Sequence, residues 1–260
     1  MSYLYDKPYI IPICIVVLYI FLLIISYSLA VATRHVYPVF PYVTDLNVVK
    51  PESSFFALMF TIIAVLMLIA AYIRYRKVRF VCDNIDFEEK RITYHLNLAQ
   101  FVDAFIVVIF MIILANSTDS WSYASGVCAG LFFVILMVLD IVISNFIYPA
   151  FGNEYVNLFK IGLTVVALIL FIMKFTFQSL ALERYNGFNS LYWTPHEAGY
   201  TVHVMGAICD WLFHIVTIIF FGLFICDFRE IKFEEPYVIA KCSTCPEDGM
   251  CYIDTNLECK

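Results

Sequence analysis

Three ionisable residues lie within one apolar stretch near the end of the chain. His203, Asp210 and His214 are separated by seven and four residues. At about 3.6 residues per turn, these spacings place all three on one face of a helix, which Gly206 and Ala207 share. Imidazole and carboxylate groups can relay protons, and both are common zinc ligands. The pattern therefore indicates either a proton or substrate relay, or part of a metal site.

The spacing argues against a metal-dependent hydrolase. Asp210 and His214 are one turn apart and could share an ion, but His203 lies roughly 10 Å from Asp210 along the helix axis. Zinc ligands bind at about 2.0–2.2 Å, so His203 cannot join that ion from the same helix. The carboxylates of Asp103 and Asp140 are expected roughly 10 Å or more from His214 along the bundle. We therefore predict no metal and no cofactor. An intramembrane lipid-modifying hydrolase is the second alternative function, after the transporter considered next.

A better partner for Asp210 is Lys174, in the preceding apolar stretch. Lys174 is eight residues and Asp210 nine residues from the same end of their stretches, so both lie at a depth of roughly 12–14 Å. A charge at the bilayer centre costs about 2.5–3.5 kcal/mol, which favours pairing. We predict an ion pair that fixes the register of two antiparallel helices. The alternative is a relay through His203 and His214, as in a small-solute or proton-coupled transporter.

Long apolar stretches must position these residues. The chain has 260 residues, of which 62% are hydrophobic and 15% charged, whereas soluble domains have about 45–50% apolar and about 25% charged residues. A helix needs about 20 mostly apolar residues to cross a bilayer and satisfies its own backbone there. The stretches that meet this length are 9–32, 55–73, 98–116, 126–147, 159–182 and 201–227. The sequence therefore predicts an all-α membrane protein with six transmembrane helices in one bundle.

Lysine and arginine predict the orientation of this bundle. Twelve of the 16 lie on the side of both chain ends, three lie on the other side, and Lys174 lies within a span. By the positive-inside rule, both termini are cytosolic. The outward side carries aromatic residues typical of a membrane interface, namely Trp121, Tyr123, Tyr192 and Trp193. It also carries the glycosylation sequon at Asn116, although its closeness to the third span argues against its use.

The outward loop between the first two spans, residues 35–53, is stiff and aromatic. Its distinctive residues are His35, Pro38, Pro41, Tyr42, Asp45, Pro51, Glu52 and Ser53. The prolines fix their own φ and favour extended conformations before them, and Glu52 and Ser53 suit the start of a helix. One interpretation, which we favour, is a lid that caps the bundle. The other is a headgroup or ligand site built from His35, Asp45 and Glu52.

Two features are expected on the cytosolic side. A basic cluster follows the second span and consists of Arg74, Arg76, Lys77 and Arg79; such a cluster marks topology and attracts anionic lipids.

The tail, residues 231–260, contains Cys242, Cys245, Cys251 and Cys259. Their spacing fits zinc poorly and a cytosolic tail keeps thiols reduced, so we predict a flexible tail. Cys226 and Cys82, at the membrane edge, are candidates for S-acylation. The chain has no basic arm or Gly-rich phosphate loop, so we predict no nucleic-acid partner.

The loop and the last span together resemble the DRAM (damage-regulated autophagy modulator) family. In the loop, the resemblance lies in His35, residues 38–42, Asp45 and residues 51–53, followed by Arg74-Tyr75. Near the end of the chain it lies in residues 192–195, His203, residues 207–211 and Asp227-Phe228. It covers about residues 9–230. Some members carry glutamate at the position of Asp210, so the position keeps a carboxylate.

The resemblance implies a six-helix protein of lysosomal, endosomal or plasma membranes that modulates autophagy or phosphoinositide signalling. One related protein is a yeast suppressor of phosphatidylinositol 4-kinase defects. The resemblance brings no catalytic residue to this chain. We therefore predict a non-enzymatic integral membrane modulator, with residues 1–230 as the membrane domain and a lysosomal or endosomal location favoured over the plasma membrane. Its expected partners are membrane lipids, including anionic phosphoinositides, and a protein that the sequence does not name.

Overall fold

The described part of the chain is almost entirely helical. In this computed structural model it comprises residues 7–84, 88–117, 120–147, 154–186, 191, 193–229 and 231. The long helices are α2 (Ile10–Ala32), α3 (Glu52–Asn84), α4 (Lys90–Asn116), α5 (Ser120–Ile147), α6 (Glu154–Arg184) and α7 (Tyr200–Arg229), and η1 (Val43–Asn47) is a short 3-10 helix. All six long helices have the length and apolar composition needed to cross a membrane. The predicted all-α, six-span fold is confirmed.

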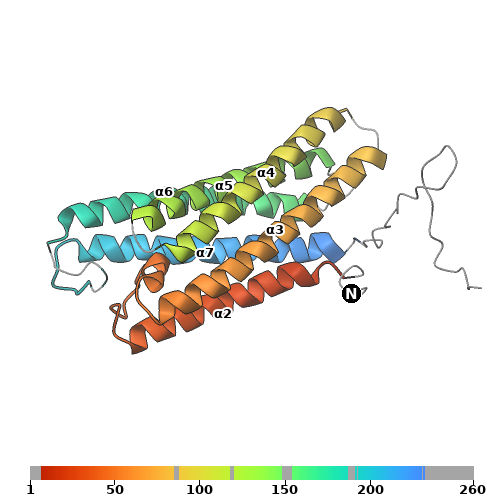
Figure 1. The fold of residues 1–260 in the computed structure, drawn as a ribbon. Coiled ribbons are helices and arrows are strands. Elements are labelled where there is room, and N and C mark those ends of the chain that lie inside the picture. Colours follow the sequence, from red (N-terminus) through yellow and green to blue (C-terminus); the bar gives the residue numbers. More distant parts are fainter. Residues whose placement is uncertain are drawn as a thin grey trace, which may run out of the picture.

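The helices form one antiparallel bundle (Figure 1). Each helix packs against the next one in the sequence, and α2 also packs against α7, which closes the ring. Because the number of spans is even, the beginning of α2 and the end of α7 lie at the same end of the bundle (Figure 1). We call this the terminal end, and the opposite end, which carries residues 33–51, the loop end.

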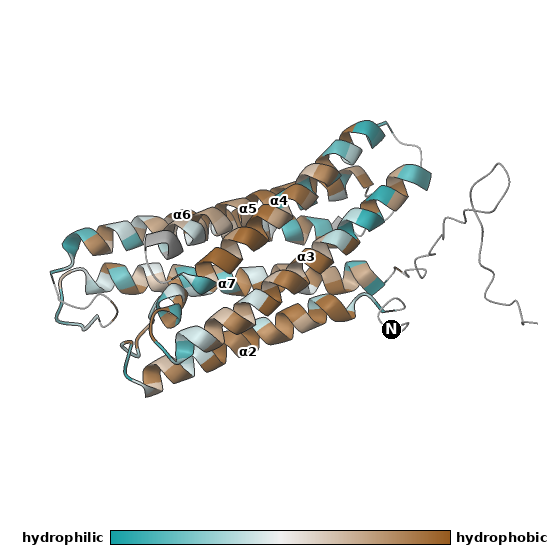
Figure 2. Ribbon diagram, in the orientation of Figure 1, coloured by the Kyte–Doolittle hydropathy of each residue, from teal (hydrophilic) through white to brown (hydrophobic). Residues whose placement is uncertain are grey.

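Helices α3 and α4 are longer than predicted. The second and third spans were expected at 55–73 and 98–116, but α3 continues to Asn84 and α4 begins at Lys90. Figure 2 shows that the extra turns are hydrophilic and project beyond the apolar middle of the bundle. Hydropathy locates the part of a helix that lies in hydrocarbon, whereas the backbone hydrogen bonds can continue into water. The residues of the basic cluster therefore lie on a helix and not in a loop.

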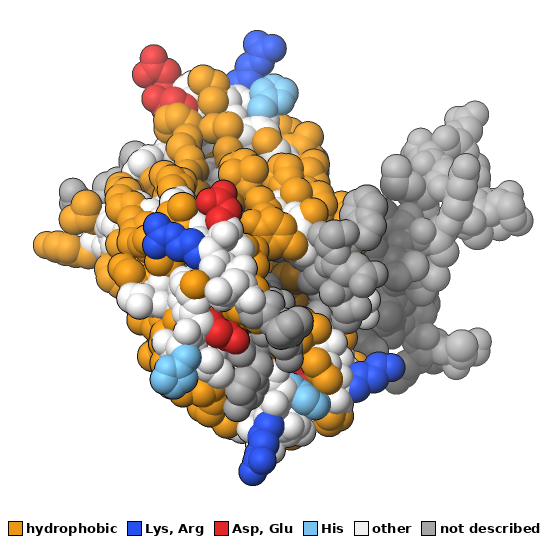
Figure 3. Space-filling model, turned by 90° about the vertical axis from the view of Figure 1, so that its left-hand side faces the viewer, with side chains coloured by type: hydrophobic (Ala, Val, Ile, Leu, Met, Phe, Trp, Pro, Cys, Tyr) orange, Lys and Arg blue, Asp and Glu red, His pale blue; other side chains and the backbone are white. Residues whose placement is uncertain are grey.

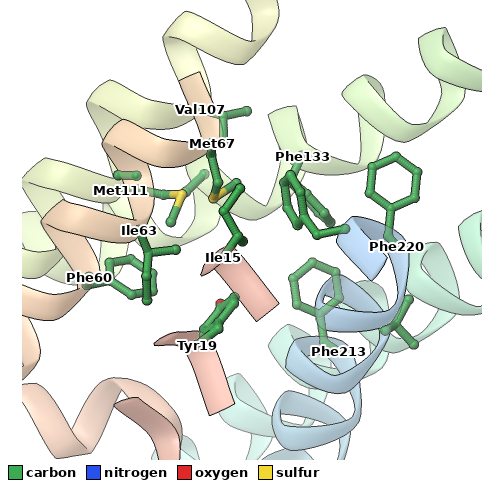
Figure 4. Packing of buried hydrophobic residues seen from close by; sticks show 14 of the residues in the cluster. Ile15, Tyr19, Phe60, Ile63, Met67, Val107, Met111, Phe133, Phe213 and Phe220 are labelled. Atoms are coloured by element: carbon green, nitrogen blue, oxygen red, sulfur yellow. The ribbon is translucent and has the colours of Figure 1, made fainter. Parts of the chain in front are cut away.

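Aromatic and sulfur-containing side chains fill the middle of the bundle (Figure 4). Tyr19 from α2 meets the ring of Phe60 from α3 edge-on, with 6.0 Å between centroids. Phe133 from α5 meets Phe213 and Phe220 from α7 in the same way. Lipid tails are as apolar as this core, so close van der Waals packing holds the helices together.

Two glycines at a GxxxG spacing, Gly126 and Gly130, predict a helix-packing face on α5. A Cβ atom at Gly130 would lie 2.6 Å from Cε2 of Phe171 on α6, and one at Gly126 would lie 3.5 Å from Leu114 on α4. The close approach of α5 and α6 thus depends on the missing side chain at Gly130. This confirms packing within the bundle.

We expect Gly130→Ile to destabilise the protein by about 1–3 kcal/mol, because the added side chain overpacks the contact with Phe171. Gly162→Ile is the control, since nothing lies within 4 Å of a Cβ atom at Gly162. Thermal unfolding of the purified protein in detergent measures the difference. Equal melting temperatures for the two variants would show that Gly130 does not set the distance between α5 and α6.

Candidate functional site

The predicted ion pair between α6 and α7 is present. Lys174 Nζ lies 2.5 Å from Asp210 Oδ1, and the Asp210 side chain is fully buried. His214 Nε2 lies 3.6 Å from the same carboxylate oxygen, and His214 Nδ1 is 2.8 Å from the hydroxyl of Tyr19. The contact agrees with the equal depths of the two charged residues in their helices, and the cluster joins α2, α6 and α7.

His203 lies apart from this ion pair. Its ring stacks on Trp193, with centroids 4.4 Å apart and planes at 11°, and it meets the ring of Tyr42 edge-on at 5.0 Å. Within the described ranges, no group of three or more His, Cys, Asp or Glu residues is placed to hold a metal ion. His203 therefore helps to join α7 to the loops at this end of the bundle.

The loop end is closed by the segment around η1. The backbone N–H of Val43 donates a hydrogen bond to Asp210 Oδ2 at 2.8 Å, and Trp211 Nε1 donates to the carbonyl of Pro41 at 2.9 Å. The amide of Asn47 donates to the carbonyl of Leu114, at the end of α4, at 2.9 Å. The segment is thus bonded to α4 and α7, as a lid would be. Figure 3, which looks onto this end, shows hydrophobic side chains with a few charged ones between them.

Gly206 makes room for the lid on α7. A Cβ atom at Gly206 would overlap the hydroxyl of Tyr42 and lie 3.1 Å from Cβ of Phe177. Tyr42 itself is only 2% exposed. The small residue in the polar face of α7 therefore lets an aromatic ring of the lid enter between α6 and α7.

The three residues proposed for a headgroup site fall into two places. His35 Nδ1 lies 2.5 Å from Glu52 Oε1, a contact that joins the end of α2 to the start of α3. Asp45 instead accepts a hydrogen bond from the backbone N–H of Tyr42 at 3.2 Å and so caps η1. Burial, together with the negative charge of Asp210, raises the pKa of Asp45, whereas the hydrogen bond from the Tyr42 N–H and the charge of Lys174 lower it. The resulting pKa of Asp45 is about 7. The site therefore divides into an interhelical contact and a capping residue.

A second ionic cluster, which we did not predict from the sequence, lies nearer the terminal end. The fully buried Asp140 of α5 accepts from Arg74 Nε of α3 and Lys160 Nζ of α6, both at 3.0 Å. Lys160 also lies 2.9 Å from Asp227 Oδ2 of α7, and Gln100 of α4 donates to Asp140 at 3.2 Å. Five helices meet in this cluster. Counting from the ends of the expected spans does not reveal this cluster, because Asp140 lies seven residues inside its span whereas Lys160 lies one residue inside its own.

The lipid-facing interpretation of the basic cluster is wrong for Arg74, which is 5% exposed and bonded to Asp140 and Ser144. Lys77 Nζ donates to the backbone carbonyl of Asp227 at 2.9 Å. Arg76 and Arg79 are exposed. The helical course of α3 explains the difference, because it turns some of these side chains inward and others outward.

Several other predicted sites can be located only in part. Cys82 is buried and Cys226 exposed, so of these two only Cys226 is accessible for S-acylation. Asn116 is the last residue of α4, where its amide donates to the carbonyl of Ile112. The side chain of Trp121, residue Tyr192 and the four tail cysteines lie outside what the structure describes. Their predicted roles remain predictions.

The pKa of Asp45 generates a pH-dependent prediction. The folded-state value of about 7 lies above the ordinary value of 3.8, so the fold favours the protonated carboxyl. The stabilisation from the protonated group is complete below about pH 4 and is lost as the pH rises through 7. Asp45→Asn, which cannot ionise and keeps the acceptor for the Tyr42 N–H, should raise the melting temperature at pH 8 and leave it almost unchanged at pH 4.

The control for this experiment is Asp83→Asn, since Asp83 is exposed and only loosely paired with Arg79 at 3.9 Å. Its effect on the melting temperature should be small at every pH. A gain in Asp45→Asn that is the same at pH 4 and pH 8, or a loss at pH 8, would contradict the raised pKa.

Comparison with known proteins bears on the identity of this bundle. A family model described as the Frag1/DRAM/Sfk1/Cwh43P N-terminal domain matches residues 8–231. The chain is 28% identical over 219 residues to DNA damage-regulated autophagy modulator protein 2 of Bos taurus, covering 80% of this chain and 79% of the relative. It is 28% identical over 216 residues to DNA damage-regulated autophagy modulator protein 1 of Homo sapiens, covering 80% of this chain and 85% of the relative. No solved structure matches the chain.

The family model spans all six helices, and the resemblance seen in the loop and the last span is thereby confirmed. The chain belongs to the Frag1/DRAM/Sfk1/Cwh43P family of membrane proteins.

Proposed function

We propose that this protein modulates autophagy from a lysosomal or endosomal membrane without catalysing a reaction, through contacts of its helices and loops with lipids or a protein partner. Two relatives are named autophagy modulators, which supports the biological role. The observation that carries the proposed mechanism is the pairing of charged residues within the membrane spans. Lys174 and Asp210 form one cluster, and Arg74, Lys160, Asp140 and Asp227 form the other, so each has as many acidic as basic residues when His214 is neutral. Asp103, which is buried in α4, belongs to neither cluster.

The cluster at the loop end pairs one lysine with one aspartate, and the second oxygen of that aspartate accepts the backbone N–H of Val43. The cluster at the terminal end balances Arg74 and Lys160 against Asp140 and Asp227. A transport or catalytic site needs a charged group that can exchange its partner. Buried pairs with additional hydrogen bonds instead fix the geometry of the helices that carry them.

A transporter is the second candidate, and one observation favours it. A cavity of about 60 Å³ below the lid is lined by Lys174, His214, Tyr19 and Thr44, among mostly apolar residues. This volume is enough for a few water molecules. A transporter would use this cavity for pH-dependent flux that Asp210→Asn abolishes. The small volume and the direct bond from Val43 to Asp210 favour a closed structural cluster.

We further propose that the terminal end faces the cytosol. The excess of Lys and Arg on that side supports this orientation. The exposed side chains of Arg76 and Arg79 would then lie beside the inner leaflet and attract anionic lipids, including phosphoinositides. We also propose that the protein contacts a protein partner, as predicted from the sequence.

A rescue experiment separates a structural ion pair from a relay. Cells that lack the protein are starved, autophagic flux is measured, and the wild type or a variant is restored. Lys174→Gln and Asp210→Asn should each destabilise the protein by about 3–5 kcal/mol and lower its abundance, because each leaves one buried charge without its partner. The double variant Lys174→Gln/Asp210→Asn is neutral and keeps an acceptor for Val43, so it should restore both abundance and flux.

Glu183→Gln is the control for loss of a single charge, since Glu183 is exposed near the end of α6. It should rescue as the wild type does. A double variant of normal abundance that restores no flux would favour the relay and exclude a purely structural pair. Unchanged flux in cells that lack the protein would refute the role in autophagy.

A further inference from the structure

A groove on the outside of the bundle is formed where the lid, α2 and α7 meet. Its walls are Leu23, Ile24, Tyr27 and Ser28 of α2, Pro38, Val39 and Phe40 of the loop, and Trp211 of α7, and its volume is about 430 Å³. Ile24, Val39 and Phe40 are 58%, 42% and 47% exposed. Because α2 has the length and composition of a membrane span, the groove opens toward the bilayer, and its occupant must come from there.

The aromatic walls of the groove are held rigidly. The rings of Tyr27 and Trp211 meet edge-on, 5.9 Å apart and at 88°. The hydroxyl of Tyr27 donates to the carbonyl of Pro38 at 2.7 Å, and Trp211 Nε1 donates to the carbonyl of Pro41 at 2.9 Å. Both rings therefore have their polar atoms satisfied by the lid and turn apolar surfaces toward the groove. Phe40 has a positive φ of 45°, a strained conformation that surrounding structure must hold in place.

The groove lies within one leaflet. Along α2, which ends at Ala32, Ser28 lies roughly 6 Å and Leu23 roughly 14 Å from the loop end. Half of the hydrocarbon core is about 15 Å thick. Among the lining residues no side chain is charged. The hydroxyl of Ser28, which donates to the carbonyl of Ile24, keeps a lone pair that can accept one more hydrogen bond.

We propose that this groove binds a sterol from the leaflet at the loop end, with the sterol hydroxyl directed toward Ser28 and the fused rings lying against Tyr27, Phe40 and Trp211. A sterol has one hydroxyl group at the end of a rigid, flat hydrocarbon about one leaflet long, which fits a groove with one exposed hydroxyl and flat apolar walls. A phospholipid chain would lose the freedom of many rotatable bonds in the same place. The lack of charged lining residues gives a phosphate headgroup nothing to bind.

The inference goes beyond the proposed role in autophagy and does not depend on it. Binding is measured with the purified full-length protein, whereas flux is measured in cells, so that either can fail alone. The probe is a cholesterol analogue that carries a photoreactive diazirine, added to the protein in detergent micelles. Labelling should map to residues 23–40, and unlabelled cholesterol should compete for it, whereas phosphatidylcholine at the same concentration should not.

Two matched variants test the position of the site. Ile24→Trp fills the groove from a lipid-facing position and should reduce labelling about tenfold. Val17→Trp is the control, because Val17 is 57% exposed, as Ile24 is at 58%, and lies two turns earlier on the same helix, outside the groove. It should leave labelling unchanged. Ser28→Ala should weaken cholesterol competition about three- to tenfold, the effect of losing one hydrogen bond.

Equal labelling of the Ile24→Trp and Val17→Trp variants would overturn the proposal, since the probe would then mark the lipid-facing surface in general. Equal competition by phosphatidylcholine would overturn it as well, because the groove would then hold any acyl chain. Both tryptophans replace exposed residues on the lipid-facing side, so both variants should fold. Their melting temperatures and elution profiles establish this before labelling.

Discussion

A charged side chain that is surrounded by hydrocarbon must have a neutralising partner, and this requirement explains most of the polar structure of the bundle. Lys174 and Asp210 neutralise each other between α6 and α7. Arg74, Asp140 and Lys160, together with Asp227, do the same among α3, α5, α6 and α7. Packing between apolar surfaces alone distinguishes poorly between helix registers in lipid. The charged pairs add that distinction, since a shift by one turn would move a charge away from its partner.

The same requirement connects the lid to the helices. Asp210 has two oxygens, and Lys174 occupies only one side of the carboxylate. The backbone N–H of Val43 bonds the other oxygen, so that the loop between α2 and α3 completes the environment of a charge on α7. The lid is therefore more than a cover. Its position and the ionisation of Asp210 depend on each other, and the contact of His35 with Glu52 holds the beginning and the end of the same segment together.

The amino-acid sequence predicted the number of spans and the pairing of Lys174 with Asp210, because both follow from counting apolar residues and helical depth. The same count fails for Asp140 and Lys160, which lie seven residues and one residue inside their expected spans. Their depths agree only because α6 begins at Glu154, six residues before Lys160. The error over Arg74 arose because hydropathy marks where apolar residues end, whereas α3 continues as a helix to Asn84. The bond from Val43 to Asp210 could not be predicted in this way, since the direction of a loop N–H depends on how residues 43–47 turn. The groove beside Trp211 likewise depends on where that loop crosses α2 and α7.

The unequal lengths of the helices also shape the surface outside the membrane. At about 1.5 Å per residue, the 33 residues of α3 extend roughly 50 Å and the 27 residues of α4 roughly 40 Å, whereas the hydrocarbon core is about 30 Å thick. The surplus forms a two-helix arm that stands off the bilayer at the terminal end. A peripheral protein docked on its tip would be kept at a fixed height above the headgroups, and its orientation would follow any tilt of the bundle.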